Sequence, residues 1–218
     1  MPAWTGAVRH RLDSVINVMR QRDLRRLQLG WTAFFMVDAM SMVALSVWAF
    51  DDGGASAVGI LGVCRLLPGA LALPFGAWAA DRFSRRLVVT AVFAAISVTQ
   101  ALIAIALVTS MPAPAVFVLV AVGSVAATPY RSAQLALAPL IASTPSELVA
   151  MNVTAGTLEG LATFAGPAVA ALLLLTTDPW FVVGAAAIVA GAGFVAVSGI
   201  RVDVDPSKRV RRRRDRPL

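Results

Sequence analysis

The sequence predicts an all-α membrane protein, a bundle of six transmembrane helices. Of its 218 residues, 58% are hydrophobic and 14% are charged, a balance too apolar for the surface of a soluble domain. Because a bilayer core about 30 Å thick requires roughly 20 apolar residues per helix, this length has room for about six spans and not for twelve. The basic residues cluster between apolar runs, which indicates membrane topology and disfavours a nucleic-acid partner.

Arginines alternate with apolar side chains in residues 1–28. This pattern predicts an amphipathic helix on the cytoplasmic membrane surface, and it does not resemble a cleavable signal peptide. A transmembrane bundle at 29–200 follows, and a basic tail at 201–218 ends the chain. The bundle contains six apolar runs, each long enough to cross a bilayer: 29–50, 57–80, 87–109, 114–137, 149–175 and 179–200.

The connections between the runs alternate in charge, and the alternation predicts their orientation. The loops at 51–54, 111–114 and 177–179 contain no base, whereas three arginines follow the second run. Basic loops remain on the cytoplasmic side, so both termini are expected in the cytoplasm of a multi-pass protein of the cell inner membrane. The loop at 143–147 must then be cytoplasmic too, although it has no base. The tail either binds anionic lipid or serves as a stop signal that fixes the orientation.

The segment between the second and third runs resembles the signature loop of the major facilitator superfamily. In that loop a glycine precedes an Asp-Arg pair and two further bases, as in Gly76, Asp81, Arg82, Arg85 and Arg86. Two positions that are glycine in the family pattern are occupied by Ala77 and Ser84. The resemblance implies one six-helix half of a fold that normally has twelve spans. It also implies that the charged residues latch one conformation from the cytoplasmic side.

Other stretches resemble the drug and siderophore exporter branch of that superfamily: 22–27, Asp38 with Val43-Ala44, 65–68, 129–133 and 166–168. They imply an integral membrane secondary transporter that exports small molecules, coupled to an ion, by alternating access. The antiporter pattern is incomplete, because Leu119 stands near the usual place of an arginine and alanines replace glycines at 162, 170 and 171.

Ionisable residues inside the apolar runs are the candidate substrate or proton-coupling groups. Each costs about 2.5 to 3.5 kcal/mol on insertion scales, so each requires a partner or a water-filled cavity. Asp38, Arg65 and Glu159 fall near the midplane, where transporters of this kind hold substrates and ions. We expect Asp38 or Glu159 to exchange protons while Arg65 serves as a charge partner. The alternative is a static salt bridge that locks helices together.

Arg131 lies in the cytoplasmic third of the fourth run. It is expected to extend to the inner interface or to pair with Asp81 or Glu147, and it is grouped with the latch residues. Small residues are expected at helix contacts, because Gly156 and Gly160 are four residues apart on one helix face. Helix packing in the fifth run is therefore assigned to Gly156, Gly160, Gly166 and Pro167.

The predicted partners are the lipid bilayer, a small-molecule substrate and a second six-helix unit. That unit is either a copy of the chain or a separate C-terminal half, because the two halves of such transporters share one topology. The alternative is a truncated half-transporter that does not transport and acts as a membrane interaction or regulatory subunit, or is a remnant. The sequence predicts no enzyme, no cofactor and no metal site, since it has one histidine, one cysteine and no phosphate-binding loop.

Overall fold

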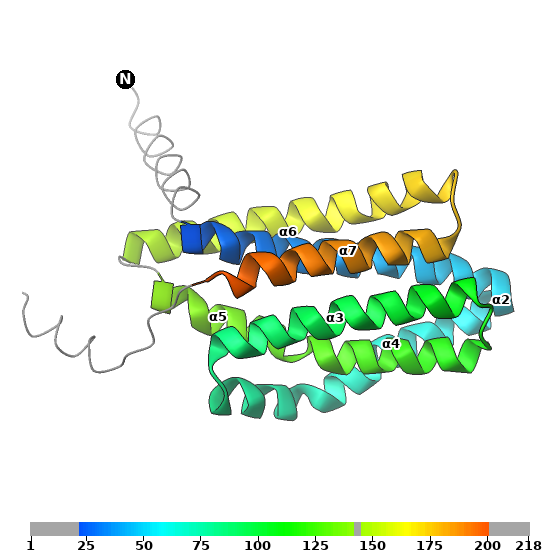
Figure 1. Cartoon of the computed structure of the whole chain (residues 1–218), viewed down its shortest axis with the longest axis horizontal. Helices are drawn as coiled ribbons and strands as arrows, with labels where there is room; N and C mark the ends of the chain where they lie inside the picture. Colours follow the sequence, from blue (N-terminus) through cyan, green and yellow to red (C-terminus); the bar gives the residue numbers. More distant parts are fainter. Residues whose placement is uncertain (1–21, 142–144, 201–218) are drawn as a thin grey trace, which may run out of the picture.

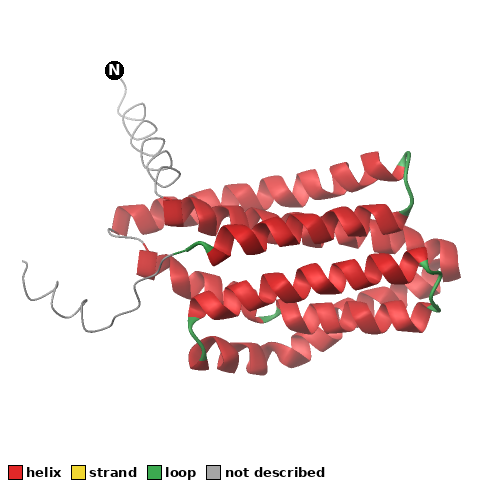
Figure 2. Cartoon of the chain, viewed as in Figure 1, coloured by secondary structure: helices red, strands yellow, loops and turns green. Residues whose placement is uncertain are grey.

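The computed structural model describes residues 22–141 and 145–200, and every regular element among them is a helix (Figure 2). The predicted surface helix up to residue 21 and the tail from residue 201 lie outside the described residues. The elements are α2 (Arg22–Arg82), α3 (Arg85–Val108), α4 (Ala113–Ala127), α5 (Pro129–Ile141), α6 (Pro145–Leu174) and α7 (Pro179–Ser198).

Five described segments are long and apolar enough to cross a membrane: Arg22–Gly76, Arg85–Val108, Ala113–Leu137, Glu147–Leu174 and Pro179–Ser198. The expected number was six. The difference arises in α2, a 61-residue helix in which Gly53 and Gly54 have non-helical backbone angles. Figure 1 shows that α2 reverses direction there, so its two arms run antiparallel.

The reversal of α2 depends on Gly54, whose φ of 64° and ψ of −154° fall in a region that is almost restricted to glycine. We expect Gly54→Ala to destabilise the protein by about 1 to 3 kcal/mol, because a Cβ is strained in that conformation. The matched control is Gly59→Ala, at an exposed helical position where a Cβ would meet no described atom within 4 Å. Thermal unfolding in detergent measures the stability of both variants. Equal unfolding midpoints for Gly54→Ala and Gly59→Ala would contradict the expected strain at Gly54.

Helix ends in the bundle follow local signals in the sequence. Ser84 is the N-cap of α3, and its hydroxyl accepts a hydrogen bond from the Leu87 N–H at 3.4 Å. Pro179 occupies the first turn of α7, where its missing N–H has no helical partner to lose. The fourth predicted run, 114–137, corresponds to the single apolar segment Ala113–Leu137, within which α4 ends at Ala127 and α5 begins at Pro129.

The core lies where aromatic side chains of α2, α3 and α5 meet around Tyr130, which is fully buried. The Tyr130 ring stacks on Phe34 with centroids 4.2 Å apart and meets the edge of Phe93 at 5.3 Å. A Cβ on Gly193 would lie 2.5 Å from Phe93, so this glycine lets α7 approach α3 closely.

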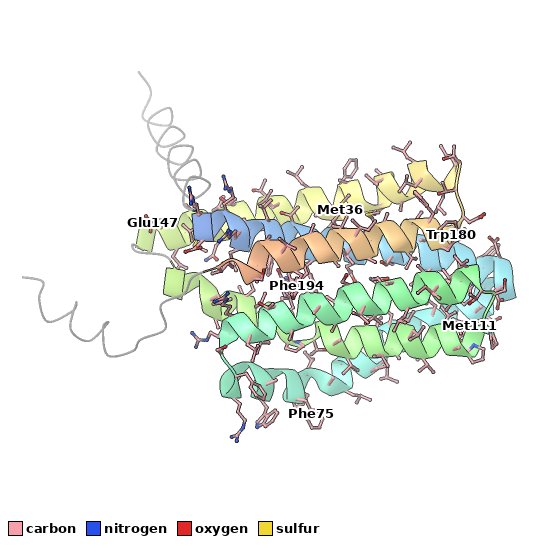
Figure 3. The ribbon with its side chains drawn as sticks, in the orientation of Figure 1. Met36, Phe75, Met111, Glu147, Trp180 and Phe194 are labelled. Carbon is pink, nitrogen blue, oxygen red and sulfur yellow. The ribbon has the colours of Figure 1, made fainter. Side chains whose placement is uncertain are left out.

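Figure 3 shows Glu147 at one end of the bundle and Met111 and Trp180 at the other. The helix ends near Glu147 also carry the described arginines that flank the membrane, and the opposite end carries carboxylates. The outside of the bundle is apolar, with Leu66, Phe75, Phe164 and Ile188 each more than 70% exposed. A surface of this kind requires lipid around it.

Candidate substrate and coupling site

The first part of the site is an ion pair between the two arms of α2. Asp38 lies fifteen residues before Gly53, and Arg65 lies eleven residues after Gly54. At about 1.5 Å per residue both are about 15 to 25 Å from the reversal, which brings them to similar depth in the bundle. The Arg65 guanidinium donates to the Asp38 carboxylate, and its Nη2 also donates to the Asp38 backbone carbonyl at 2.9 Å.

The two members of this pair differ in exposure. The Asp38 side chain is 60% exposed and the Arg65 side chain is 21% exposed, so the arginine is held inside and the carboxylate faces open space. The structure thus brings together two residues that the sequence predicted as charge partners.

The second part is a pair between α5 and α6. Arg131 Nη2 lies 3.4 Å from Glu159 Oε1, and its guanidinium lies 5.9 Å from the Trp31 ring centroid and 5.7 Å from the Phe35 centroid. The ion pair that the structure describes for Arg131 is with Glu159, a partner that the sequence did not indicate. Arg131 lies in the first turn of α5, close to α6 and to the aromatic side chains of α2. The pairing of Arg131 with Asp81 or Glu147 stays a prediction.

The two ion pairs lie on one side of the bundle. Phe35, beside Arg131, precedes Asp38 by one helical turn on the same side of α2. On α6 the side that carries Glu159 has exposed small or polar residues at helical spacing: Asn152, Gly156, Gly160 and Thr163. We call this surface, from Asp38 and Arg131 to the α6 residues, the open face.

The packing predictions for the fifth run divide into two outcomes. A Cβ on Gly166 would lie 2.6 Å from Ala39 Cβ and 3.3 Å from the Met36 carbonyl, so Gly166 is a point of close helix contact. Gly156 and Gly160 make no close helix contact within the described bundle, because a Cβ at either would meet no described atom within 4 Å, and their role in packing against another helix stays a prediction. They lie on the open face because α6 turns its Gly166 side toward α2. Pro167 lies inside α6 and is half-buried.

The arginines assigned to the cytoplasmic latch do not converge on one contact among the described residues. Arg85 donates to the Ala136 carbonyl of α5 at 3.0 Å, and Arg86 donates to the Ser198 carbonyl at the end of α7. Cations at helix C-termini are favourable, because the last carbonyls carry partial negative charge. Arg82 lies over the Trp78 ring at 5.9 Å. Asp81 is the next-to-last residue of α2, and its side chain is outside the described set.

A cavity of about 250 Å³ opens beside the Asp38–Arg65 pair. It lies between the two arms of α2, α3 and α4. Two of its polar side chains, Thr99 and Ser124, were not predicted from the sequence. Serine and threonine are common in membrane helices, so only the fold shows which of them line a cavity. A third cavity residue, Gln100, donates from Nε2 to Ser41 Oγ at 2.8 Å, an interhelical hydrogen bond.

The Arg131–Glu159 pair is partly exposed, so we expect it to contribute modestly to the stability of the folded protein. We expect Arg131→Met to lower the free energy of unfolding by about 1 kcal/mol, since it removes an ion pair and two cation–π contacts. A double-mutant cycle with Glu159→Gln should give a coupling energy of about 0.5 to 1 kcal/mol. Arg25→Met, at an exposed site near the start of α2, is the control. A coupling energy of zero between Arg131 and Glu159 would contradict their ion pair.

Comparison with known proteins gives one match. A family model described as Major Facilitator Superfamily matches residues 29–218, which are 190 of the 218 residues. A search of the curated proteins and a search of the solved structures each return no match. Proteins of this superfamily are transporters and not enzymes. With its long apolar helices, the chain is a multi-pass membrane protein of the transporter class, and it belongs to the major facilitator superfamily.

Proposed function

We propose that the chain is one half of a secondary transporter that exports small molecules by alternating access, coupled to an ion. Both arms of α2 would cross the membrane, which gives six crossings. The helix ends rich in arginine would face the cytoplasm, with both termini on that side of the cell membrane. Asp81, Arg82, Arg85 and Arg86 would contribute to a latch that stabilises one conformation. The exporter branch is supported by the sequence resemblance.

The observation that carries this proposal is the open face, where two ion pairs lie on one side of an otherwise apolar bundle. Asp38 is 60% exposed and Arg131 is 64% exposed, so without a cover both would contact lipid. Exposure of a charge to hydrocarbon is costly. The two halves of major facilitator transporters are related by an axis along the membrane normal, with the substrate site between them. A second six-helix unit on the open face would enclose both pairs in a central cavity.

The coupling group would be Asp38 or Glu159. Protonation of Asp38 would remove its attraction for Arg65, and the free arginine could then find a new partner when the two halves rock. Glu159 has the same relation to Arg131. Arg131 also rests on Trp31 and Phe35, which hold it in place without the carboxylate. We therefore favour Asp38 as the coupling residue.

The mass of the protein extracted from its native membrane in lipid particles tests the assembly. We expect a dimer or a one-to-one complex with a second six-helix chain, and any copurifying polypeptide would be identified by mass spectrometry. The matched variants are Gly156→Trp on the open face and Gly59→Trp on the second arm of α2, both at exposed sites. The first should dissociate the complex and the second should not. A monomer of the unmodified chain, with no copurifying partner, would overturn the assembled transporter and favour a non-transporting half.

A further inference from the structure

The cavity beside the Asp38–Arg65 pair is formed entirely by helices of this one chain. The second arm of α2 lies against α4 at the edge of the bundle, which closes one side of the cavity (Figure 1). Two glycines allow that approach: a Cβ on Gly69 would lie 3.3 Å from the Ser124 carbonyl, and one on Gly76 would lie 3.0 Å from Thr128 Cγ2. The space left between this arm, the first arm and α3 is the cavity of about 250 Å³.

The walls of the cavity are mainly apolar, with Phe34, Leu66, Ile103 and Val120 among the lining residues. Its hydroxyl groups already have partners in their own helices, since Thr99 donates to the Ala95 carbonyl and Ser124 to the Ala121 carbonyl. The charged groups among the lining residues are Asp38 and Arg65. An entering molecule would therefore place its polar group on this pair and its apolar part on the walls.

The net charge of the pair limits what the cavity can accept. One carboxylate and one guanidinium compensate each other, so a charged guest would leave one charge without a partner in a site of low dielectric constant. A neutral head group that both donates and accepts hydrogen bonds could contact both partners without this penalty. An engineered cavity of about 150 Å³ holds benzene, so the present volume fits one ring with a short polar arm.

We propose that this cavity binds a compact, uncharged molecule with one ring and a hydroxyl or amide head group. The ring lies among α2, α3 and α4, and the head group contacts the Asp38–Arg65 pair. As a substrate subsite, this inference rests on the proposed export function. Binding itself can be measured without transport and without the second half.

Protection of an introduced thiol tests the site with three probes of matched shape: 2-phenylethanol, which is neutral, 2-phenylethylamine, which is a cation, and phenylacetate, which is an anion. The protein is held in native-lipid particles with Cys64→Ala, which removes the free cysteine among the described residues, and with Ser124→Cys in the cavity. Iodoacetamide labelling is followed by mass spectrometry. The control is Ser56→Cys, an exposed site near the reversal of α2 and outside the cavity.

We expect 2-phenylethanol to slow labelling of Ser124→Cys at a concentration about tenfold or more below that needed for either charged probe. Labelling of Ser56→Cys should not change, which separates binding from general effects of the probes on lipid. Equal protection by the three probes, no protection by 2-phenylethanol, or no labelling of Ser124→Cys at all would overturn the proposal.

Two variants reverse the expected order of the probes. Asp38→Asn leaves the arginine uncompensated and should make phenylacetate the best protector, whereas Arg65→Gln leaves the carboxylate and should favour 2-phenylethylamine. An unchanged order in variants that remain folded, as judged by their thermal unfolding, would overturn the proposal. A monomeric protein with the expected probe order would overturn the assembled transporter and leave this site intact, so the two failures are distinguishable.

Discussion

Gly166→Leu is expected to destabilise the bundle by about 3 kcal/mol, at the upper end of the usual cost of overpacking. The contact explains the size of the effect. A Cβ at this position would lie 2.6 Å from Ala39 Cβ and 3.3 Å from the Met36 carbonyl, and the second of these atoms is backbone that cannot rotate away. Leucine would therefore push α6 away from α2. Thermal unfolding in detergent and the yield of folded protein measure the loss.

Gly156→Leu is the matched control, because the substitution is the same and lies in the same helix, ten residues away. No described atom lies within 4 Å of a Cβ there, so in the isolated chain in detergent, without a second unit on the open face, the free energy of unfolding should be unchanged or slightly increased by the better helix propensity of leucine. An equal loss of stability in the two variants would contradict the packing of α6 described above.

The sequence predicted helix ends well where apolar length and local caps agree. The third run was expected at 87–109 and α3 covers Arg85–Val108, while the sixth was expected at 179–200 and α7 covers Pro179–Ser198. The fourth run was expected at 114–137, and Ala113–Leu137 is one apolar segment long enough to cross a membrane. What was not expected is the turn at Thr128, which divides this segment into α4 and α5. Hydropathy alone does not place this division, because the segment Ala113–Leu137 as a whole stays apolar enough to cross a membrane.

The sequence predicted which charged residues belong to the candidate site better than it predicted which of them pair with each other. The cost of isolated charge in a membrane shows that Asp38, Arg65, Glu159 and Arg131 require partners, and this depends on composition alone. Which carboxylate pairs with which arginine depends on the rotation of each helix about its axis. For the same reason, sequence spacing assigned Gly156 to a helix contact, and the structure places it on the open face while Gly166 packs against α2.

Asp38→Asn is expected to abolish the dependence of transport on a pH gradient and to slow transport by up to roughly a hundredfold. The amide keeps the size of the side chain but cannot exchange a proton, and it leaves the Arg65 charge uncompensated where that side chain is 21% exposed. An uncompensated arginine costs about 2.5 to 3.5 kcal/mol at the centre of a membrane helix, which is roughly a hundredfold in a conformational equilibrium. Efflux of a fluorescent test substrate from proteoliposomes with an imposed pH gradient measures both effects.

Two further variants separate proton coupling from a static salt bridge at Asp38. Asp38→Asn with Arg65→Gln removes both charges, so stability should return to near that of the unmodified protein while the response to the pH gradient stays absent. Glu159→Gln should have a smaller effect on transport than Asp38→Asn, because Arg131 is 64% exposed and keeps its contacts with Trp31 and Phe35. A static bridge predicts instead that the double variant recovers pH-dependent transport together with stability. That recovery, or unchanged pH dependence in both single variants, would show that proton coupling does not reside in these carboxylates.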